Sequence, residues 1–161
     1  MTIRGLKLSD SLDASGMRVA IIKTRWNTSV VNALVEACFD YLNAKNASEV
    51  VVEEVGGAFE LPLVAQSMAK SGKFGAIIAI GCLIKGETMH FEYISSAAVE
   101  GIMRVGLDTG VPVINGILNV LEENQALSRA GLLGNHENEA VGWAKTAVQQ
   151  VHILSKYKPF P

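Results

Sequence analysis

The sequence predicts a single three-layer α/β domain, in which a four-stranded parallel sheet carries helices on both faces. Short apolar runs rich in β-branched residues alternate four times with longer stretches of helical periodicity, which is the pattern of βαβ units. One run, residues 77–84, is apolar throughout, as expected of a strand buried on both faces. Right-handed crossovers between such strands place helices on both sides of the sheet. No internal repeat, linker or low-complexity segment indicates a second domain.

The expected strands and helices follow one another along the chain. Four strands are expected at residues 17–22, 49–55, 77–84 and 111–118. Five helices are expected at about residues 29–44, 61–72, 87–110, 122–130 and 139–156. Pro62 suits the first turn of the second helix, and Gly72 suits its end. Pro112 is compatible only with the start or the edge of its strand, because proline cannot donate a ladder hydrogen bond.

Residues 1–16 are polar and mixed in character, and they precede the first expected strand. We expect them to form an amino-terminal arm that becomes ordered only against another surface. The folded domain is then expected to comprise residues 17–161.

The composition argues against several classes of protein. A net charge of −2 without a basic run argues against a nucleic-acid binder. No stretch approaches about 18 apolar residues, so no membrane span is expected, and the amino terminus lacks the apolar core of a signal peptide. These features favour the cytoplasm. The positive mean hydropathy of +0.27 is high for a small monomer and indicates apolar surface buried between subunits.

The common cofactor and metal motifs are incomplete in this chain. Residues 81–88 nearly follow GxxxxGK[ST], but Glu87 stands where a phosphate-binding lysine is required. Residues 90–92 match half of a zinc deaminase signature, yet no PCxxC segment exists. Cys38 and Cys82 lie in a predicted helix and a predicted strand, where buried free thiols are expected. There is no GxGxxG or GxSxG segment either, so we expect neither a metal nor a cofactor.

Polar residues gather in the turns that follow the carboxyl ends of the expected strands. These turns span residues 25–27, 56–60, 85–90 and 119–123. Ligands of open α/β sheets bind at this edge of the sheet. The third turn combines Lys85, Glu87, Thr88 and His90 at the start of a helix, where free backbone N–H groups attract anions. We therefore expect the chemical site at this turn.

Single candidate residues allow more than one interpretation. His90 fits either a structural histidine or a proton carrier, since histidine titrates near neutral pH. Trp26 fits a core position and a ring that stacks on a ligand equally well. Glu60 is more simply a solvated carboxylate, and Arg129 is more simply a charge that complements the end of its helix. Taken singly, none of these residues decides the function.

Five segments together resemble one enzyme family. They are RWN at 25–27, GGAFELP at 56–62, GCLIKGETMHFEYIS at 81–95, DTGVPVINGIL at 108–118 and ENQALSRAG at 123–131. In this combination the chain resembles the 6,7-dimethyl-8-ribityllumazine synthase family from about residue 17 to residue 150.

The resemblance implies both a reaction and an architecture. The reaction is that of a transferase of riboflavin biosynthesis, which condenses 5-amino-6-(D-ribitylamino)uracil with 3,4-dihydroxy-2-butanone 4-phosphate and releases phosphate and water. No cofactor or metal is implied. The implied fold is a flavodoxin-like sandwich with strand order 2-1-3-4, and the implied sites lie between adjacent subunits of a homopentamer.

The resemblance also implies roles for individual residues. Those expected around the pyrimidine and the ribityl chain are Trp26, Asn27, Ala58, Phe59, Glu60, Cys82, Leu83 and Ile84. Trp26 would stack on the ring, where many members have Phe. Glu87 and Thr88 would offer N–H groups to the phosphate, and Arg129 would supply the opposite charge. His90 would move protons during Schiff-base formation and phosphate elimination.

Two regions depart from the family pattern. Asn115 stands where the family often has a Phe from the neighbouring subunit, and an amide can hydrogen-bond the ring but stacks less well. Residues 132–139 form a longer turn than in capsid-forming members and lack their lysine. We therefore expect a free pentamer, because the longer turn should obstruct contacts between pentamers. His136 falls near that lysine's place and is a candidate to approach the phosphate, and the amino-terminal arm would pair with a neighbour's sheet.

Two other functions are compatible with the same scaffold. A non-catalytic carrier of flavin or lumazine would have no catalytic use for His90 or Arg129. The presence of both residues therefore favours an enzyme. A flavodoxin-like electron carrier would need a phosphate loop rich in Ser and Thr after the first strand. Residues 24–26 of this chain, Thr-Arg-Trp, are a poor substitute for such a loop.

Overall fold

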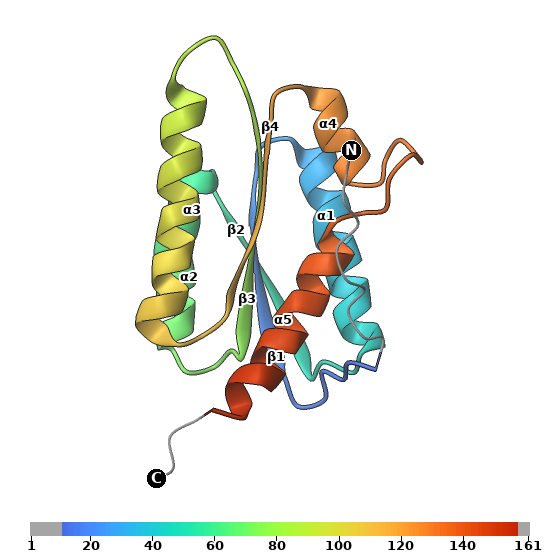
Figure 1. Ribbon diagram of the computed structural model, residues 1–161, viewed down its shortest axis with the longest axis vertical. Coiled ribbons are helices and arrows are strands. Elements are labelled where there is room, and N and C mark those ends of the chain that lie inside the picture. The colour runs from blue at the N-terminus through green and yellow to red at the C-terminus, as the bar shows by residue number, and fades with distance from the viewer. Residues whose placement is uncertain (1–10, 158–161) are drawn as a thin grey trace.

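The central element of the computed structural model, which describes residues 11–157, is a parallel sheet of four strands (Figure 1). The strands are β1 Arg18–Thr24, β2 Glu49–Val55, β3 Ala76–Ile84 and β4 Val113–Val120. They are hydrogen-bonded in the order β2-β1-β3-β4, and every neighbouring pair is parallel. The predicted fold class and strand order are therefore confirmed.

Helices cover both faces of this sheet, which gives the predicted three layers (Figure 1). The helices on one face are α1 Thr28–Ala44, α4 Glu123–Arg129 and α5 Ala140–Ser155. Those on the other face are α2 Leu61–Lys70 and α3 His90–Thr109. A short 3₁₀ turn, η1 Ala58–Glu60, leads directly into α2.

The central strand β3 supplies apolar side chains to both cores. Ile77 and Ala79 pack under α2 and α3, whereas Ile78, Ile80 and Cys82 pack under α1 and α5. The first 7 residues of β3 are all buried. Full burial of an isoleucine side chain stabilises the fold by about 1.5–3 kcal/mol. Two-sided burial is therefore the reason why this stretch of sequence is apolar throughout.

The ends of the elements follow the expected signals, with one consequential shift. Pro62 lies in the first turn of α2, and Gly72, just beyond the end of that helix, has a φ of 69°. α3 begins at His90 and not directly after Gly86. Residues 85–89 are consequently a turn at the carboxyl edge of the sheet, and their backbone is not part of the helix.

Two strands, β1 and β4, end two residues later in the chain than expected. β4 begins at Val113 because Pro112 has no N–H to donate, although the Pro112 carbonyl accepts a hydrogen bond from Ile77 N at 2.9 Å. β1 continues to Thr24 because its register with β2 extends to the pair Thr24 and Val55. The polar end of β1 therefore still belongs to the sheet.

Residues 11–16 lie against the domain itself. Ala14 is fully buried, and its N–H donates to the Lys45 carbonyl at 2.7 Å. Ser15 forms an isolated antiparallel bridge with Ala47, and the Asp13 carbonyl lies 2.6 Å from His152 Nε2. The predicted arm of residues 1–16 falls mostly on residues 1–10, which lie outside the described part of the chain. The division of the chain at residue 16 stays a prediction.

Gly116 of β4 has no room for a side chain, and this predicts a large effect of a small change. A methyl group there would lie 2.9 Å from the Ala79 carbonyl oxygen and 3.0 Å from Trp143 Cε3. We expect Gly116→Ala to lower the free energy of unfolding by about 1–3 kcal/mol in urea titrations. Gly142→Ala is the control, because that exposed helical position has no atom within 4 Å of the added methyl. The control should gain about 0.5–1 kcal/mol, and equal stability of both variants would contradict the packing.

Candidate active site

The turns predicted to form the site lie at one edge of the sheet. Because all four strands are parallel, their carboxyl ends meet at the upper edge in Figure 1. There β3 extends past β1: the last β1–β3 pair is Lys23 with Ile80, whereas β3 pairs with β4 as far as Ile84 with Val120. The end of β3 thus has a backbone edge that no strand covers on the side of β1.

This uncovered backbone belongs to residues predicted to line the pyrimidine pocket. The Cys82 carbonyl accepts a hydrogen bond from Asn27 Nδ2 at 2.9 Å, so the Cys82 backbone faces the side of β1. Backbone groups alternate sides along a strand, and those of Ile84 therefore face the same side while those of Leu83 face β4. The Cys82 side chain is buried, whereas Leu83 and Ile84 are half-buried. The backbone donor and acceptor of Ile84 are thus available beside the turn after β1.

Trp26 and Glu60 come from two different turns and flank the same glycine. A methyl group on Gly57 would lie 3.4 Å from Glu60 Oε2 and 3.7 Å from Trp26 Cδ1 and Nε1. Trp26 is 71% exposed, which rules out a place in the core of its own chain. Ala58 is buried under α2, whereas Phe59 is 60% exposed. The exposed Trp26 ring and the Glu60 carboxylate therefore lie side by side next to Gly57, which has no side chain.

The turn between β3 and α3 presents polar groups to solvent. Glu87, Thr88 and His90 are all exposed, and His90 N–H donates to Thr88 Oγ1 at 3.4 Å. The His90 imidazole makes no hydrogen bond within residues 11–157, which argues against a satisfied structural histidine. Lys85 instead turns to Glu92, with which it forms an ion pair. The first backbone N–H groups of α3 have no partner within the helix, so this turn can receive an anion.

Arg129 lies at the end of α4, away from the turn between β3 and α3. Its Nε is 3.6 Å from Glu139 Oε1, and its Nη1 donates to the Gln125 carbonyl at 3.1 Å. The Glu139 N–H in turn donates to the Arg129 carbonyl at 2.9 Å. Within residues 11–157, Arg129 makes no hydrogen bond or ion pair with Glu87, Thr88 or His90. Within one chain, Arg129 therefore does not contact this turn through a hydrogen bond or an ion pair.

Asn115 and His136 also lie apart from the other candidates. Asn115 lies in the middle of β4, opposite Ala79. It stands four positions before Asn119, which is near the carboxyl end of β4, so roughly 13 Å of strand separates the two residues. Its Oδ1 accepts a hydrogen bond from Ile117 N at 3.1 Å. His136 is exposed in the loop between α4 and α5, where its Nδ1 is 2.6 Å from the Glu137 carbonyl.

Glu139 is a residue that the sequence patterns did not single out. It belongs to the first residues of a predicted helix, where an acidic side chain is ordinary. Its contact with Arg129 depends on the loop that brings the chain back to the end of α4. Asn138 fixes this return, because its Nδ2 donates to the carbonyls of Ala33 and Ala130, both at 3.0 Å. No pattern of residue spacing in the sequence predicts this path of the loop between α4 and α5.

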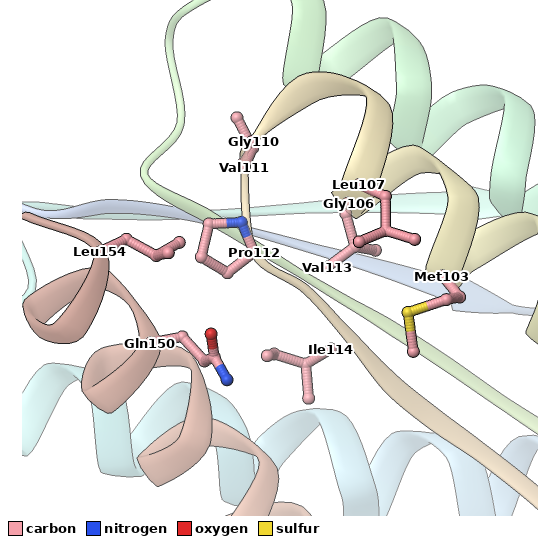
Figure 2. A pocket seen from close by; sticks show the side chains of 10 residues that line it. All are labelled: Met103, Gly106, Leu107, Gly110, Val111, Pro112, Val113, Ile114, Gln150 and Leu154. Atoms are coloured by element: carbon pink, nitrogen blue, oxygen red, sulfur yellow. The ribbon is translucent and has the colours of Figure 1, made fainter. Parts of the chain in front are cut away.

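The apolar hollow at the opposite end of β4 is not the predicted site. It has a volume of about 400 Å³ and lies between the end of α3, the start of β4 and the end of α5 (Figure 2). Its lining side chains include Met103, Leu107, Pro112, Ile114 and Leu154. None of the predicted catalytic or substrate-binding residues lines it. It also has no charged side chain that could orient a phosphate.

Two further classes of feature can be assessed for residues 11–157. No group of three or more His, Cys, Asp or Glu side chains in this part of the chain is placed to hold a metal ion. None of its helices is both long enough and apolar enough to cross a membrane.

Comparison with known proteins identifies the family of this chain. Residues 16–155 match the family described as 6,7-dimethyl-8-ribityllumazine synthase. The chain belongs to this family. The predicted family and the predicted class of enzyme, a transferase, are thereby confirmed.

Relatives named 6,7-dimethyl-8-ribityllumazine synthase align over most of their length. The relative from Schizosaccharomyces pombe is 44% identical over 150 residues, which cover 90% of this chain and 94% of that protein. The relative from Azoarcus sp. is 39% identical, with 92% of each chain covered. The relative from Mycobacterium sp. strain KMS is 41% identical over 89% of this chain and 88% of its own. The region that matches the lumazine synthase family therefore includes all four strands and the turns that follow them.

The two thiols of this family member predict a pH dependence. Burial raises the pKa of Cys38 to about 12 and that of Cys82 to about 11. At pH 8 we expect Ellman's reagent to react slowly with the native protein and to detect 2 thiols after unfolding in urea. Rapid reaction of the native protein would contradict the burial.

The same shifts have a defined sign for stability. The folded-state pKa of each thiol lies above the unfolded one, so the thiols stabilise the fold fully below about pH 8.5. They lose this contribution as the pH rises toward 11 for Cys82 and toward 12 for Cys38. Between pH 8 and pH 10 the wild type should lose on the order of 2 kcal/mol more unfolding free energy than Cys82→Ala. Urea titrations at both pH values measure this difference.

Proposed function

We propose that this chain condenses 5-amino-6-(D-ribitylamino)uracil with 3,4-dihydroxy-2-butanone 4-phosphate, giving 6,7-dimethyl-8-ribityllumazine with release of phosphate and water. The observation that carries the proposal is the juxtaposition of Trp26 and Glu60 around Gly57. The same sheet edge holds the start of α3 and the exposed His90. An aromatic face, a carboxylate, an anion site and a proton carrier are the groups that this condensation needs.

The pyrimidine substrate is proposed to bind between Trp26 and the uncovered end of β3. Trp26 offers a large aromatic face that can stack on the ring. The N–H and C=O groups of Ile84 face the same side as the Cys82 backbone and can pair with the ring's own donors and acceptors. Glu60 accepts hydrogen bonds from ribityl hydroxyls, beside Ala58 and the exposed Phe59.

The phosphate of the second substrate is proposed to bind at the start of α3. Glu87 and Thr88 supply backbone N–H groups there, and the helix dipole favours an anion. The neutralising charge is assigned to Arg129, as the family resemblance implies, while Lys85 pairs with Glu92. Arg129 is remote from this turn in its own chain, and this separation supports a site completed by the Arg129 of an adjacent subunit.

His90 is proposed to move protons between the amine, the carbonyl oxygen and the departing groups. Attack of the 5-amino group on the ketone requires loss of an amine proton and protonation of the carbonyl oxygen, which then leaves as water. Elimination of phosphate requires removal of a proton from carbon. An exposed imidazole next to the anion site can accept and return these protons without metal or cofactor assistance in the proposed scheme.

Self-association as a homopentamer is part of the proposal. Four apolar side chains of α3 and the turn before it are between 58% and 77% exposed, namely Met89, Tyr93, Met103 and Leu107. An exposed apolar stripe of this kind supports burial against another subunit. Asn115, remote from the edge of its own sheet, is assigned to a neighbour's pyrimidine site.

The longer turn after α4 supports a free pentamer over a capsid. Leu132 and Leu133 are about half exposed within this turn, which protrudes beyond α4 in Figure 1. We expect size-exclusion chromatography with light scattering to give the mass of five chains, because the turn obstructs packing of pentamers on one another. A capsid-sized particle would contradict this assignment.

The reaction itself tests the proposal. Mixing the two substrates with the protein should accelerate both the rise of lumazine absorbance and the release of phosphate. His90→Asn should lower turnover by on the order of 10²-fold, because proton transfer then falls to water. His152→Asn is the matched control and should leave turnover unchanged, since His152 contacts the Asp13 carbonyl far from the sheet edge. No acceleration by the wild-type protein would end the enzyme proposal.

Stacking by Trp26 is tested by a pair of variants. Trp26→Ala should weaken binding of the pyrimidine substrate by roughly 1 kcal/mol or more beyond the loss of contact area. Trp26→Phe retains an aromatic face and should bind with an affinity close to that of the wild type. Titration calorimetry with the pyrimidine substrate measures both variants. Equal affinities for the alanine and phenylalanine variants would exclude stacking.

A further inference from the structure

We infer that Asn27 is a positioning residue, which holds Trp26 and the Cys82 carbonyl in place without touching the substrate itself. The inference rests on the proposed function of this edge, and it refines the substrate-binding role expected for Asn27. Two independent features support it: the backbone conformation of Asn27 and the long-range hydrogen bond of its side chain.

The backbone of Asn27 is left-handed. Its φ and ψ are 54° and 52°, and within residues 11–157 Asn46 is the other non-glycine residue with positive φ. Asparagine tolerates this conformation better than most residues with a side chain. The chain therefore turns sharply between β1 and α1 immediately after Trp26, and the direction of Trp26 depends on this turn.

The side chain of Asn27 ties the same turn to β3. Its Nδ2 donates to the Cys82 carbonyl at 2.9 Å, across 55 residues of sequence. β1 ends before it can pair with this part of β3, so the Asn27 amide takes the place of the next ladder donor. A carbonyl that would otherwise face the pyrimidine pocket unpaired is thereby satisfied.

The rest of the turn is held by short local bonds. Thr28 Oγ1 donates to the Arg25 carbonyl at 2.9 Å, and Val31 N–H donates to the Asn27 carbonyl at 3.0 Å as α1 begins. Trp26 lies between these anchored residues, with its indole next to Gly57. Loss of the Asn27 amide would leave the turn fixed to α1 but free of β3. The indole would then no longer be held at a set distance from the backbone of Ile84.

Two variants separate the backbone contribution from the side-chain contribution. Asn27→Gly keeps positive φ accessible but removes the amide. Asn27→Asp keeps the size and the tolerance of positive φ, yet it replaces the donor by a carboxylate facing the Cys82 carbonyl. Asn46→Ala is the matched control, because it alters the other left-handed asparagine, whose Nδ2 bonds Asp13 at 3.3 Å away from this edge.

The first measurement uses the free protein and does not depend on catalysis. The chain has 2 tryptophans, so Trp26 is the remaining one in a Trp143→Phe background. Because Trp26 is already 71% exposed, the informative property is the mobility of its ring. Asn27→Gly and Asn27→Asp should lower the fluorescence anisotropy of Trp26, since an unanchored ring reorients more freely. Asn46→Ala should leave this anisotropy unchanged while lowering the melting temperature. Unchanged Trp26 anisotropy in both Asn27 variants would overturn the inference.

The second measurement separates the two substrates. Both Asn27 variants should raise KM for the pyrimidine substrate about tenfold, because binding must then restore a turn geometry that one hydrogen bond had held, with kcat and KM for the butanone phosphate within about twofold. A loss of pyrimidine affinity without any change of Trp26 in the free protein would mean direct contact with substrate and would overturn the inference. If the wild type shows no turnover, the proposed function fails, and the fluorescence result still decides the role of Asn27.

Discussion

The burial of β3 on both faces is the constraint on which the remaining structure depends. Because helices cover both sides and strands cover both edges over most of its length, only the carboxyl end of β3 reaches solvent. At that end β1 stops earlier than β4, and a short run of backbone is left without a strand on one side. The proposed ligand site is therefore a consequence of unequal strand lengths in a sheet whose centre is buried on both faces.

Parallel pairing brings groups that are distant in sequence to this opening. Trp26 follows β1 and Glu60 follows β2, yet both approach Gly57 within a few ångströms. Gly57 lies between them, and a methyl group there would be in ordinary van der Waals contact with the Glu60 carboxylate, at 3.4 Å. Asn27 then closes the part of the opening nearest β1 by bonding to Cys82. Aromatic, acidic and backbone groups thus meet in one place without any of them being buried in the core.

The cationic side chains around this edge are paired with carboxylates. Lys85 contacts Glu92, Arg25 contacts Glu54 at 3.3 Å, and Arg129 lies 3.6 Å from Glu139. The Arg129 pair is only partly buried, and exposed pairs contribute about 0–1 kcal/mol, so an incoming phosphate can exchange this pair at low cost. Backbone N–H groups at the start of α3 have no such competitor. In the proposed reaction they form the fixed part of the anion site, and Arg129 forms the exchangeable part.

The sequence by itself determined the layers, the order of elements and the family, because two-sided burial of residues 77–84 and helical periodicity elsewhere leave few alternatives. It also located the turn at residues 85–90, since strand ends and helix starts have local signals. The open choice for Trp26 was decided by tertiary structure, through its exposure beside Gly57. The contacts of Asn27 with Cys82 and of Arg129 with Glu139 likewise depend on chain paths that no local spacing specifies. Periodicity records which face of an element is buried, whereas side-chain contacts across a sheet edge depend on where each strand stops.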